Sequence, residues 1–492
     1  MKFMVREIKF LLIMLLSMSG LFTRAQNSQV MYYMNLPQNH LLNPAIRPSN
    51  SFYLGLPGIT GVNVNINNNF FNFSDIFSKS ASGDSVISIL HPDYDVSEFV
   101  AKIKDRNYIE PQALVQLFGL GFNAGQKLYI FLDINERVEG NFVLPGDLLR
   151  LGFEGNEQFV GNLMDLSSLR TDAKIYHEIG LGFSREFSDK LTIGIKGKYL
   201  MGIGSVSMDN KALEVLVEED YTHTFNADLM MNISAPVTVH VNANNIDSVS
   251  FDDSRFDTDK GIIDYFLKSE NTGFGFDLGA EYRFGDRFKI SAAVTDFGSI
   301  KWKRDITNLK AESTFKFSGV DMLEVYNGTM TFDSLGQELL DSLKNSFYVT
   351  DTRTPFTTYL PYGVTFGACY NLSKSFSIGV LSYTRVMGKQ FKEALTLSAN
   401  VNFGNAFSTT FAYTAANGRY DNLGAGMAFR TGWFQFYFIA DRLPVTWNKV
   451  ISDGSTIPVP ESWNTAHLRA GMNLVFGNRL KKKDDKPMLM LK

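Results

Sequence analysis

The sequence has almost no cysteine, because Cys369 is the only one among 492 residues. One thiol cannot form a disulfide within the chain, and it cannot supply the several thiolates of a cysteine-based zinc site. A disulfide framework and a zinc site of that kind are therefore excluded.

Long hydrophobic runs are also missing after residue 25. A transmembrane helix needs about 20 consecutive apolar residues, whereas the mean hydropathy of this chain is −0.07. Helices and closed β-barrels are the structures that satisfy backbone hydrogen bonding across a bilayer. If the mature chain crosses a membrane, it must therefore do so with strands.

A strong excess of one charge is missing as well. The formal net charge is −4 and the pI is about 6.0, so the composition offers no basic surface for nucleic acid. The six histidines show no metal-ligand spacing, and there is no Gly-x-Ser-x-Gly nucleophile motif. The sequence predicts no nucleic-acid partner, no cofactor, no metal and no enzymatic activity.

The first 25 residues have the organisation of an export signal. Lys2, Arg6 and Lys9 give a basic start, and residues 10–22 form an apolar core of signal-peptide length. The alternative is a membrane anchor, but the run is short for a span. We therefore predict a cleaved signal peptide at residues 1–25 and export to the outer membrane.

Aromatic residues and glycine are abundant, with Phe 42, Tyr 20 and Gly 40, and apolar residues alternate with polar ones over long segments. Between 273 and 284 the even positions are all apolar and the odd ones are glycine or charged. Similar alternation covers 175–187, 191–201, 288–297, 362–370, 394–403, 407–414 and 468–476. These runs are roughly 9–13 residues long, which suits a strand crossing a bilayer better than the strands of about 5–6 residues in soluble sheets.

This pattern predicts an all-β fold, a transmembrane antiparallel β-barrel over residues 51–476, in preference to a soluble sandwich or propeller. About 14 strands are expected. The segments 221–234 and 237–251 form a further pair, which is either a hairpin outside the barrel or two more barrel strands, giving about 16. Short joints alternate with longer insertions, predicted to be extracellular, at 70–110, 139–173, 235–271, 299–356 and 444–462.

The two ends of the mature chain differ from the strands. Residues 26–50 contain Pro37, Pro44 and Pro48 and do not alternate, so we expect them to fold into the periplasmic mouth as a hatch. Residues 477–492 form a basic periplasmic tail.

The positions predicted to face the lumen carry charges of both signs, which favours ion pairs between neighbouring strands. Either these pairs fill the lumen or they line a path for a polar solute, and no ligand residue is identified. The charges are Glu178, Glu186, Lys196, Lys198, Asp277, Glu281, Arg283, Lys289 and Arg469.

Short motifs carry a resemblance to known barrels. Asn43, Pro44 and Ala45 resemble the start of the long-chain fatty-acid transporter (FadL-like) superfamily, in which an N-terminal hatch plugs a 14-stranded barrel. The order of further motifs is similar to an uncharacterised outer-membrane barrel family of the phylum that uses type IX secretion. They are Leu-Leu-Asn-Pro-Ala (41–45), Tyr-Leu-Gly-Leu-Pro-Gly (53–58), Asn-Glu-Arg-Val (135–138), Leu-Pro-Gly-Asp-Leu (144–148) and Gly-Asn (155–156).

The resemblance implies two functions. The superfamily implies a transporter or channel for a small hydrophobic or amphiphilic solute, although its apolar ligand pocket has no counterpart in the charged inward face predicted here. Its type IX shuttle barrel implies instead a scaffold or accessory subunit of an outer-membrane assembly or secretion complex, and the long outside loops make this our first hypothesis. The expected partners are outer-membrane lipid and proteins bound at the extracellular loops or the periplasmic tail.

Overall fold

The computed structural model describes most of residues 29–477, and the predicted signal peptide and basic tail lie outside this part of the chain. Within the range, the description omits residues 80–85, 90, 92–93, 243–244, 269, 318–347, 389, 417–418, 445–446, 453–454 and 461–464. Among the described residues, no helix combines the length and hydrophobicity needed to cross a membrane.

A closed antiparallel barrel of 14 strands forms the body of the protein, which confirms the predicted fold. The last strand pairs with the first, with Phe476 opposite Phe52 and Ala470 opposite Val62. In order around the wall, the strands are β1 (Phe52–Gly55) continued by β2 (Gly61–Asn68), β5 (Arg106–Ala124), β6 (Leu128–Pro145), β8 (Arg170–Glu186), β9 (Leu191–Val217), β13 (Thr272–Phe284), β14 (Phe288–Trp302), β17 (Phe356–Tyr359) continued by β18 (Tyr362–Asn371), β19 (Phe376–Met387), β20 (Gln390–Phe403), β21 (Phe407–Ala416), β22 (Arg419–Thr431), β23 (Phe434–Ala440) and β26 (Thr465–Phe476).

The two faces of the wall reverse the arrangement of a soluble protein. Inward positions are polar and buried, among them Thr396, Asn400, Thr410, Gln435 and Asn473. Outward positions are large, apolar and exposed, among them Ile195, Phe274, Phe366, Leu397, Phe411 and Phe438. Alternate side chains of a strand point to opposite faces, so the period of two seen in the sequence becomes an apolar belt around a polar interior. This is the surface that a membrane-spanning barrel presents to lipid.

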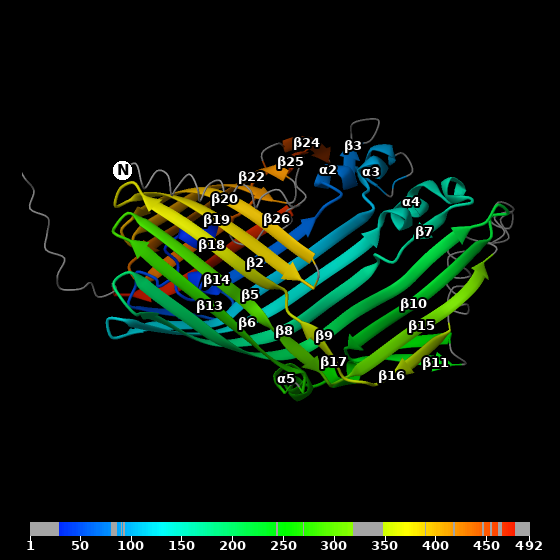
Figure 1. The fold of residues 1–492 in the computed structure, drawn as a ribbon, viewed down its shortest axis with the longest axis horizontal. Helices are drawn as coiled ribbons and strands as arrows, with labels where there is room; N and C mark the ends of the chain where they lie inside the picture. The colour runs from blue at the N-terminus through cyan, green and yellow to red at the C-terminus, as the bar shows by residue number, and fades with distance from the viewer. Residues whose placement is uncertain are drawn as a thin grey trace, which may run out of the picture.

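One side of the barrel is drawn out into a sheet beyond the wall (Figure 1). At about 3.3 Å per residue, the 27 residues of β9 reach about 90 Å, far more than a bilayer requires. Residues 191–201 of β9 pair with the wall strand β13, whereas residues 205–217 pair with β10 (His223–Ser234). The strands β15 (Ile306–Phe317), β16 (Val349–Thr352) and β7 (Leu163–Asp165) complete this outer sheet.

The barrel therefore does not gain the extra strands of the 16-strand alternative. The segment 221–234 supplies β10, which pairs with β9 and β15 instead of with 237–251. The segment 237–251 folds on itself as the hairpin of β11 (Val237–Asn242) and β12 (Asn245–Phe251). The polar residues Asn242 and Asn245 end β11 and begin β12. The predicted pairing of 221–234 with 237–251 is therefore wrong, because each segment has other partners.

The insertions have other boundaries than predicted, because several strands continue past the membrane crossing. β5 already begins at Arg106, β6 runs to Pro145 and β8 begins at Arg170, which shortens the insertions predicted at 70–110 and 139–173. Small elements occupy the loops: α2 (Phe73–Ile76), β3 (Phe77–Lys79), β4 (Val86–Ser88), α3 (Ser97–Lys102), α4 (Gly146–Glu154), η3 (Glu157–Phe159), η4 (Asp253–Phe256), α5 (Asp259–Leu267), β24 (Trp447–Ser452) and β25 (Ser455–Pro460).

The segment before the first strand lies inside the barrel, at the end where the strands are joined by short turns. It contains two 3-10 turns, η1 (Val30–Tyr33) and η2 (Pro37–Leu41), and no strand. Prolines at 37, 44 and 48 withhold backbone donors, so this segment is held by side chains and close packing. We call residues 29–50 the hatch.

Candidate functional site

One side of the hatch packs on the wall through apolar side chains, and we call this contact the apolar seat. Val30, Met31, Met34 and Leu36 form a buried cluster with residues of β21, β22 and β23, namely Ala412, Ala428, Tyr437 and Ile439. The backbone N–H of Val30 also donates to Asp441 Oδ1 at 2.8 Å. Burial of these four side chains supplies hydrophobic stabilisation, and the buried side chains of Asp441 and Arg469 adjoin the same contact.

The opposite side meets a charged part of the wall, and we call this contact the ionic seat. His40 lies 3.1 Å from Asp133 on β6, measured from Nε2 to Oδ2, and both side chains are fully buried. Lys196 on β9 bridges Asp133 at 2.8 Å and Glu178 on β8 at 2.9 Å. His40 Nδ1 is 2.7 Å from the Pro37 carbonyl oxygen, so the ring joins the hatch backbone to the wall.

The ionic seat continues into a wider buried network on the wall. Arg137 on β6 contacts Glu178 at 2.8 Å and Asp296 on β14 at 3.1 Å. Lys198 contacts Asp277 at 2.7 Å and Asp296 at 2.5 Å. Cations alternate with carboxylates throughout, which compensates the cost of removing each charge from water.

The Asn-Pro-Ala motif lies against β8, β9 and β13, on a stretch of wall that carries glycine. A Cβ atom at Gly194 of β9 would lie 2.2 Å from the Pro44 carbonyl, and one at Gly279 of β13 would lie 2.0 Å from Asn43 Oδ1. Ser184 Oγ donates to the Ala45 carbonyl oxygen at 3.1 Å. The two glycines therefore let the hatch approach the wall closely, since a larger residue at either position would displace the hatch.

Asn43 also ties the motif to η1. Its Nδ2 donates to the Tyr32 hydroxyl at 3.0 Å, and that hydroxyl donates to Ser291 Oγ at 2.8 Å. Burial raises the pKa of Tyr32 to about 12, so the hydroxyl keeps its proton and acts as donor and acceptor at once.

The remaining predicted charges lie outside the central network. Glu186 pairs with Arg47 of the hatch at 3.1 Å. Glu281 pairs with Arg283 at 2.9 Å and lies 3.6 Å from Lys289. Arg469 is buried, with Nη1 3.3 Å from the Met31 sulfur. Glu178, Lys196, Lys198 and Asp277 are therefore brought together, while the others surround the hatch separately.

Sequence reasoning missed several members of the network. Asp133 and Arg137 stand at alternate positions of β6, so the period of two could have identified them. Asp296 has φ 63° and lies at a register shift between β13 and β14, which disturbs the alternation. His40 carries no such signal, because the hatch has no regular period.

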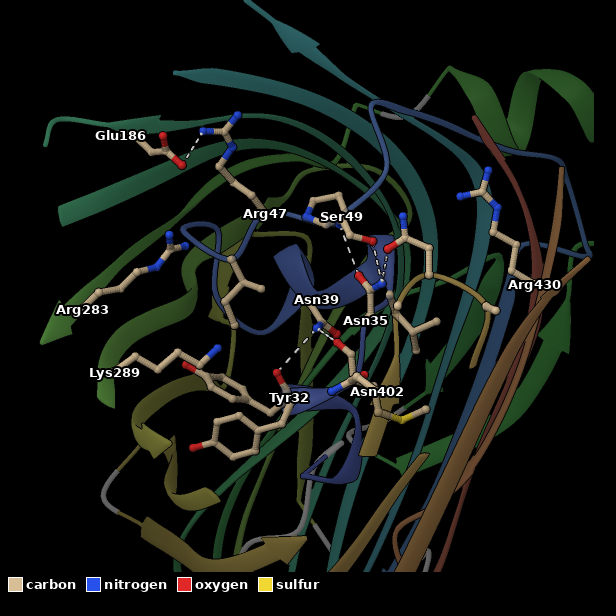
Figure 2. A pocket seen from close by; sticks show the side chains of 18 of the residues that line it. Tyr32, Asn35, Asn39, Arg47, Ser49, Glu186, Arg283, Lys289, Asn402 and Arg430 are labelled. Carbon is tan, nitrogen blue, oxygen red and sulfur yellow. Dashed lines mark hydrogen bonds and ion pairs between the residues drawn. The ribbon is translucent and has the colours of Figure 1, made fainter. Parts of the chain in front are cut away.

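A cavity of about 1240 Å³ opens between the hatch and the wall at the short-turn end. Figure 2 shows Arg283, Lys289 and Arg430 around it, with Arg47 paired to Glu186. A smaller cavity of about 210 Å³ lies toward the long loops and is lined by Arg170, Lys174, Arg385 and Glu139 among others. Among the residues described by the structure, no group of three or more His, Cys, Asp or Glu is placed to hold a metal ion.

Comparison with solved structures finds similar chains of low sequence identity. The Ralstonia pickettii toluene transporter TbuX is 8% identical, with a TM-score of 0.38 over 90% of this chain and 94% of that one. A Pseudomonas aeruginosa FadL homologue is 9% identical, with a TM-score of 0.41 over 93% of this chain and 100% of that one. The Pseudomonas putida toluene transporter TodX is 8% identical, with a TM-score of 0.36 over 92% and 98%. At such TM-scores these likenesses carry no conclusion about the activity of this chain.

A comparison with curated proteins finds no relative. A family model does match, over residues 44–441, which begins within the hatch motif and covers most of the barrel. The chain therefore belongs to the family of unknown function DUF5723.

Proposed function

We propose that the protein is an outer-membrane channel that transports a small amphiphilic solute and is gated by its hatch. The observation that carries this proposal is the unequal seating of the hatch, apolar against β21–β23 and ionic against β6–β9. A plug that only filled the lumen would be served by apolar packing throughout, since buried ion pairs add little stability over well-packed apolar residues. A polar contact with buried charged residues can be exchanged for contacts with water when water enters, which suits a gate.

The cavities support a path past the hatch. One lies on each side of the buried network, and both combine charged with uncharged lining residues. A solute with a polar group and an apolar body would match such surfaces, whereas a purely apolar one would find no apolar tunnel among the described residues. We orient the short turns toward the periplasm, the usual arrangement of bacterial barrels.

The scaffold hypothesis draws no support from the contacts of the described residues. It rested on the long outside loops, and these loops are built around their own small cores, such as the cluster of Phe70, Phe99, Val100 and Ile103. Membership in the phylum that uses type IX secretion stays a prediction from short motifs.

The test is a reversible lock on the hatch. Ala45→Cys and Ser184→Cys are combined in a Cys369→Ala background, because Ser184 Oγ lies 3.1 Å from the Ala45 carbonyl oxygen. The full protein is reconstituted in vesicles and crosslinked with a short bis-methanethiosulfonate reagent, which forms a reducible disulfide with each cysteine and releases methanesulfinate. Vesicle swelling then measures the entry of small solutes.

We expect the crosslinked protein to pass solute more slowly and to recover when the reagent is reduced. The two single-cysteine variants, treated in the same way, control for modification alone. Equal swelling in the locked and reduced states would contradict gating by the hatch.

A further inference from the structure

The helix α5 carries large apolar side chains that nothing in the described structure covers. Ile263 and Leu267 are 53% and 60% exposed, and Ile262 and Phe266 are exposed beside them. Residues four apart lie on the same face of a helix, so these four make one continuous apolar strip. A surface helix of a soluble protein turns such a strip toward the core, whereas α5 turns it away.

The other sides of α5 have different surroundings. Tyr265 faces the barrel, where its hydroxyl donates to the Ile203 carbonyl oxygen at 3.1 Å. Lys260, Asp264 and Lys268 follow one another at a spacing of four along the edge next to the apolar strip, and Lys268 pairs with Asp264 at 2.7 Å. The helix therefore has one side on protein, one apolar side and one charged edge, the arrangement of a helix lying in a membrane interface.

The position of α5 on the barrel places the apolar strip next to the lipid-facing belt. The Phe266 carbonyl oxygen lies 3.1 Å from Nε2 of His177, an outward residue of β8. The next outward residues of β8 include Leu181 and Phe183, which are exposed. Figure 1 shows α5 at the side of the barrel, near β8. The strip is thus continuous with the surface that the barrel presents to lipid.

The helix α5 lies at the same distance from the short-turn end as the far edge of the lipid-facing belt. His177 precedes Glu186, the last residue of β8 at the short-turn end, by nine positions. At about 3.3 Å per residue and a tilt of about 40°, His177 lies about 23 Å from that end. The apolar belt of such barrels is about 25 Å tall, so α5 lies where acyl chains meet headgroups.

We infer that α5 is an interfacial anchor whose apolar strip inserts among the acyl chains of the lipid leaflet at the long-loop end. Lipid is the occupant because the strip continues an existing lipid contact, and because the charged edge of Lys260, Asp264 and Lys268 meets the level of headgroups and water. The anchor fixes the loop that joins β12 to β13, at the base of the outer sheet. This inference does not depend on the proposed transport function.

The test measures the surroundings of a nitroxide spin label attached to full-length protein in vesicles of phosphatidylcholine and phosphatidylglycerol. Ile263→Cys and Leu267→Cys are labelled in a Cys369→Ala background. Collision with oxygen reports lipid, and collision with a water-soluble nickel chelate reports water. Phe274→Cys in the belt is the lipid reference, and Lys211→Cys in the outer sheet, with a side chain 69% exposed, is the water reference. Lys260→Cys tests the charged edge of α5 itself.

We expect labels at 263 and 267 to collide with oxygen as often as the Phe274→Cys label, and with nickel several-fold less often than the Lys211→Cys label. The label at 260 should be accessible to nickel. Nickel accessibility at 263 and 267 equal to that at 211 would overturn the inference, because the strip would then lie in water. Low collision with both reagents at 263 and 267 would also overturn it, since a protein surface would then cover the strip.

Discussion

The hatch is held by two contacts of different chemistry, and the gating proposed above gives each of them a different part. The apolar seat of Val30, Met31, Met34 and Leu36 keeps its stabilisation as long as water is excluded. The ionic seat, in which His40 and Lys196 both contact Asp133, is favourable only while the buried charges of the wall keep their partners, because an unpaired buried charge is costly. We therefore expect opening to begin at the ionic seat, with the apolar seat acting as the hinge.

The largest effect should come from removing the central cation of the ionic seat. Lys196→Met leaves Asp133 and Glu178 buried with less compensation, and we expect a loss of about 3–5 kcal/mol. Guanidinium unfolding in lipid vesicles measures it. Lys211→Met, at an exposed ion pair of 3.5 Å on the same strand, is the control and should cost about 0–1 kcal/mol. A similar fall in the free energy of unfolding in both variants would show that the buried network stabilises the protein no more than an exposed ion pair does.

The apolar seat can be broken separately. Met31 is fully buried, and Met31→Ala should cost about 2–5 kcal/mol through lost burial and the cavity left behind. Hydrogen exchange should quicken mainly in residues 29–36 and less in residues 37–45. Uniform acceleration over the whole hatch would mean that the two seats act as one unit.

Removal of the hatch's own contribution to the ionic seat should have a smaller effect on stability but a clear one on gating. His40→Ala should cost about 1.5–3 kcal/mol, the range for a hydrogen bond to a charged group. We expect faster exchange in residues 37–45 and faster vesicle swelling, with residues 29–36 little changed. His223→Ala, in the outer sheet, should leave both readouts as in the wild type.

The smallest change tests the close approach between hatch and wall. Gly194→Ala places a Cβ atom 2.2 Å from the Pro44 carbonyl, and the overpacking should cost about 1–3 kcal/mol. Gly197→Ala is the matched control on β9, since nothing lies within 4 Å of a Cβ atom there. The protection of residues 41–45 against hydrogen exchange should fall in the first variant alone, and an equal fall in both would contradict the contact.

Much of the barrel could be predicted from the sequence because its strands are long and alternate. The run from 273 to 284 is β13 almost residue for residue, and its polar positions Asp277 and Glu281 are buried inside. Prediction failed for residues 221–251, since alternation identifies a strand without naming its neighbour. β10 finds its partners in β9 and β15, and the second partner lies more than seventy residues further along the chain.

The sequence by itself determined that this chain is an apolar-outside barrel with a non-strand segment before it, because a period of two and three prolines close together in the chain are local properties. The tertiary structure alone decided that His40 meets Asp133 and that Asn43 and Pro44 rest on Gly279 and Gly194. These contacts join residues more than ninety positions apart. They depend on barrel closure, which brings strands from distant parts of the chain around one lumen. A local sequence pattern does not say which distant residues will meet there.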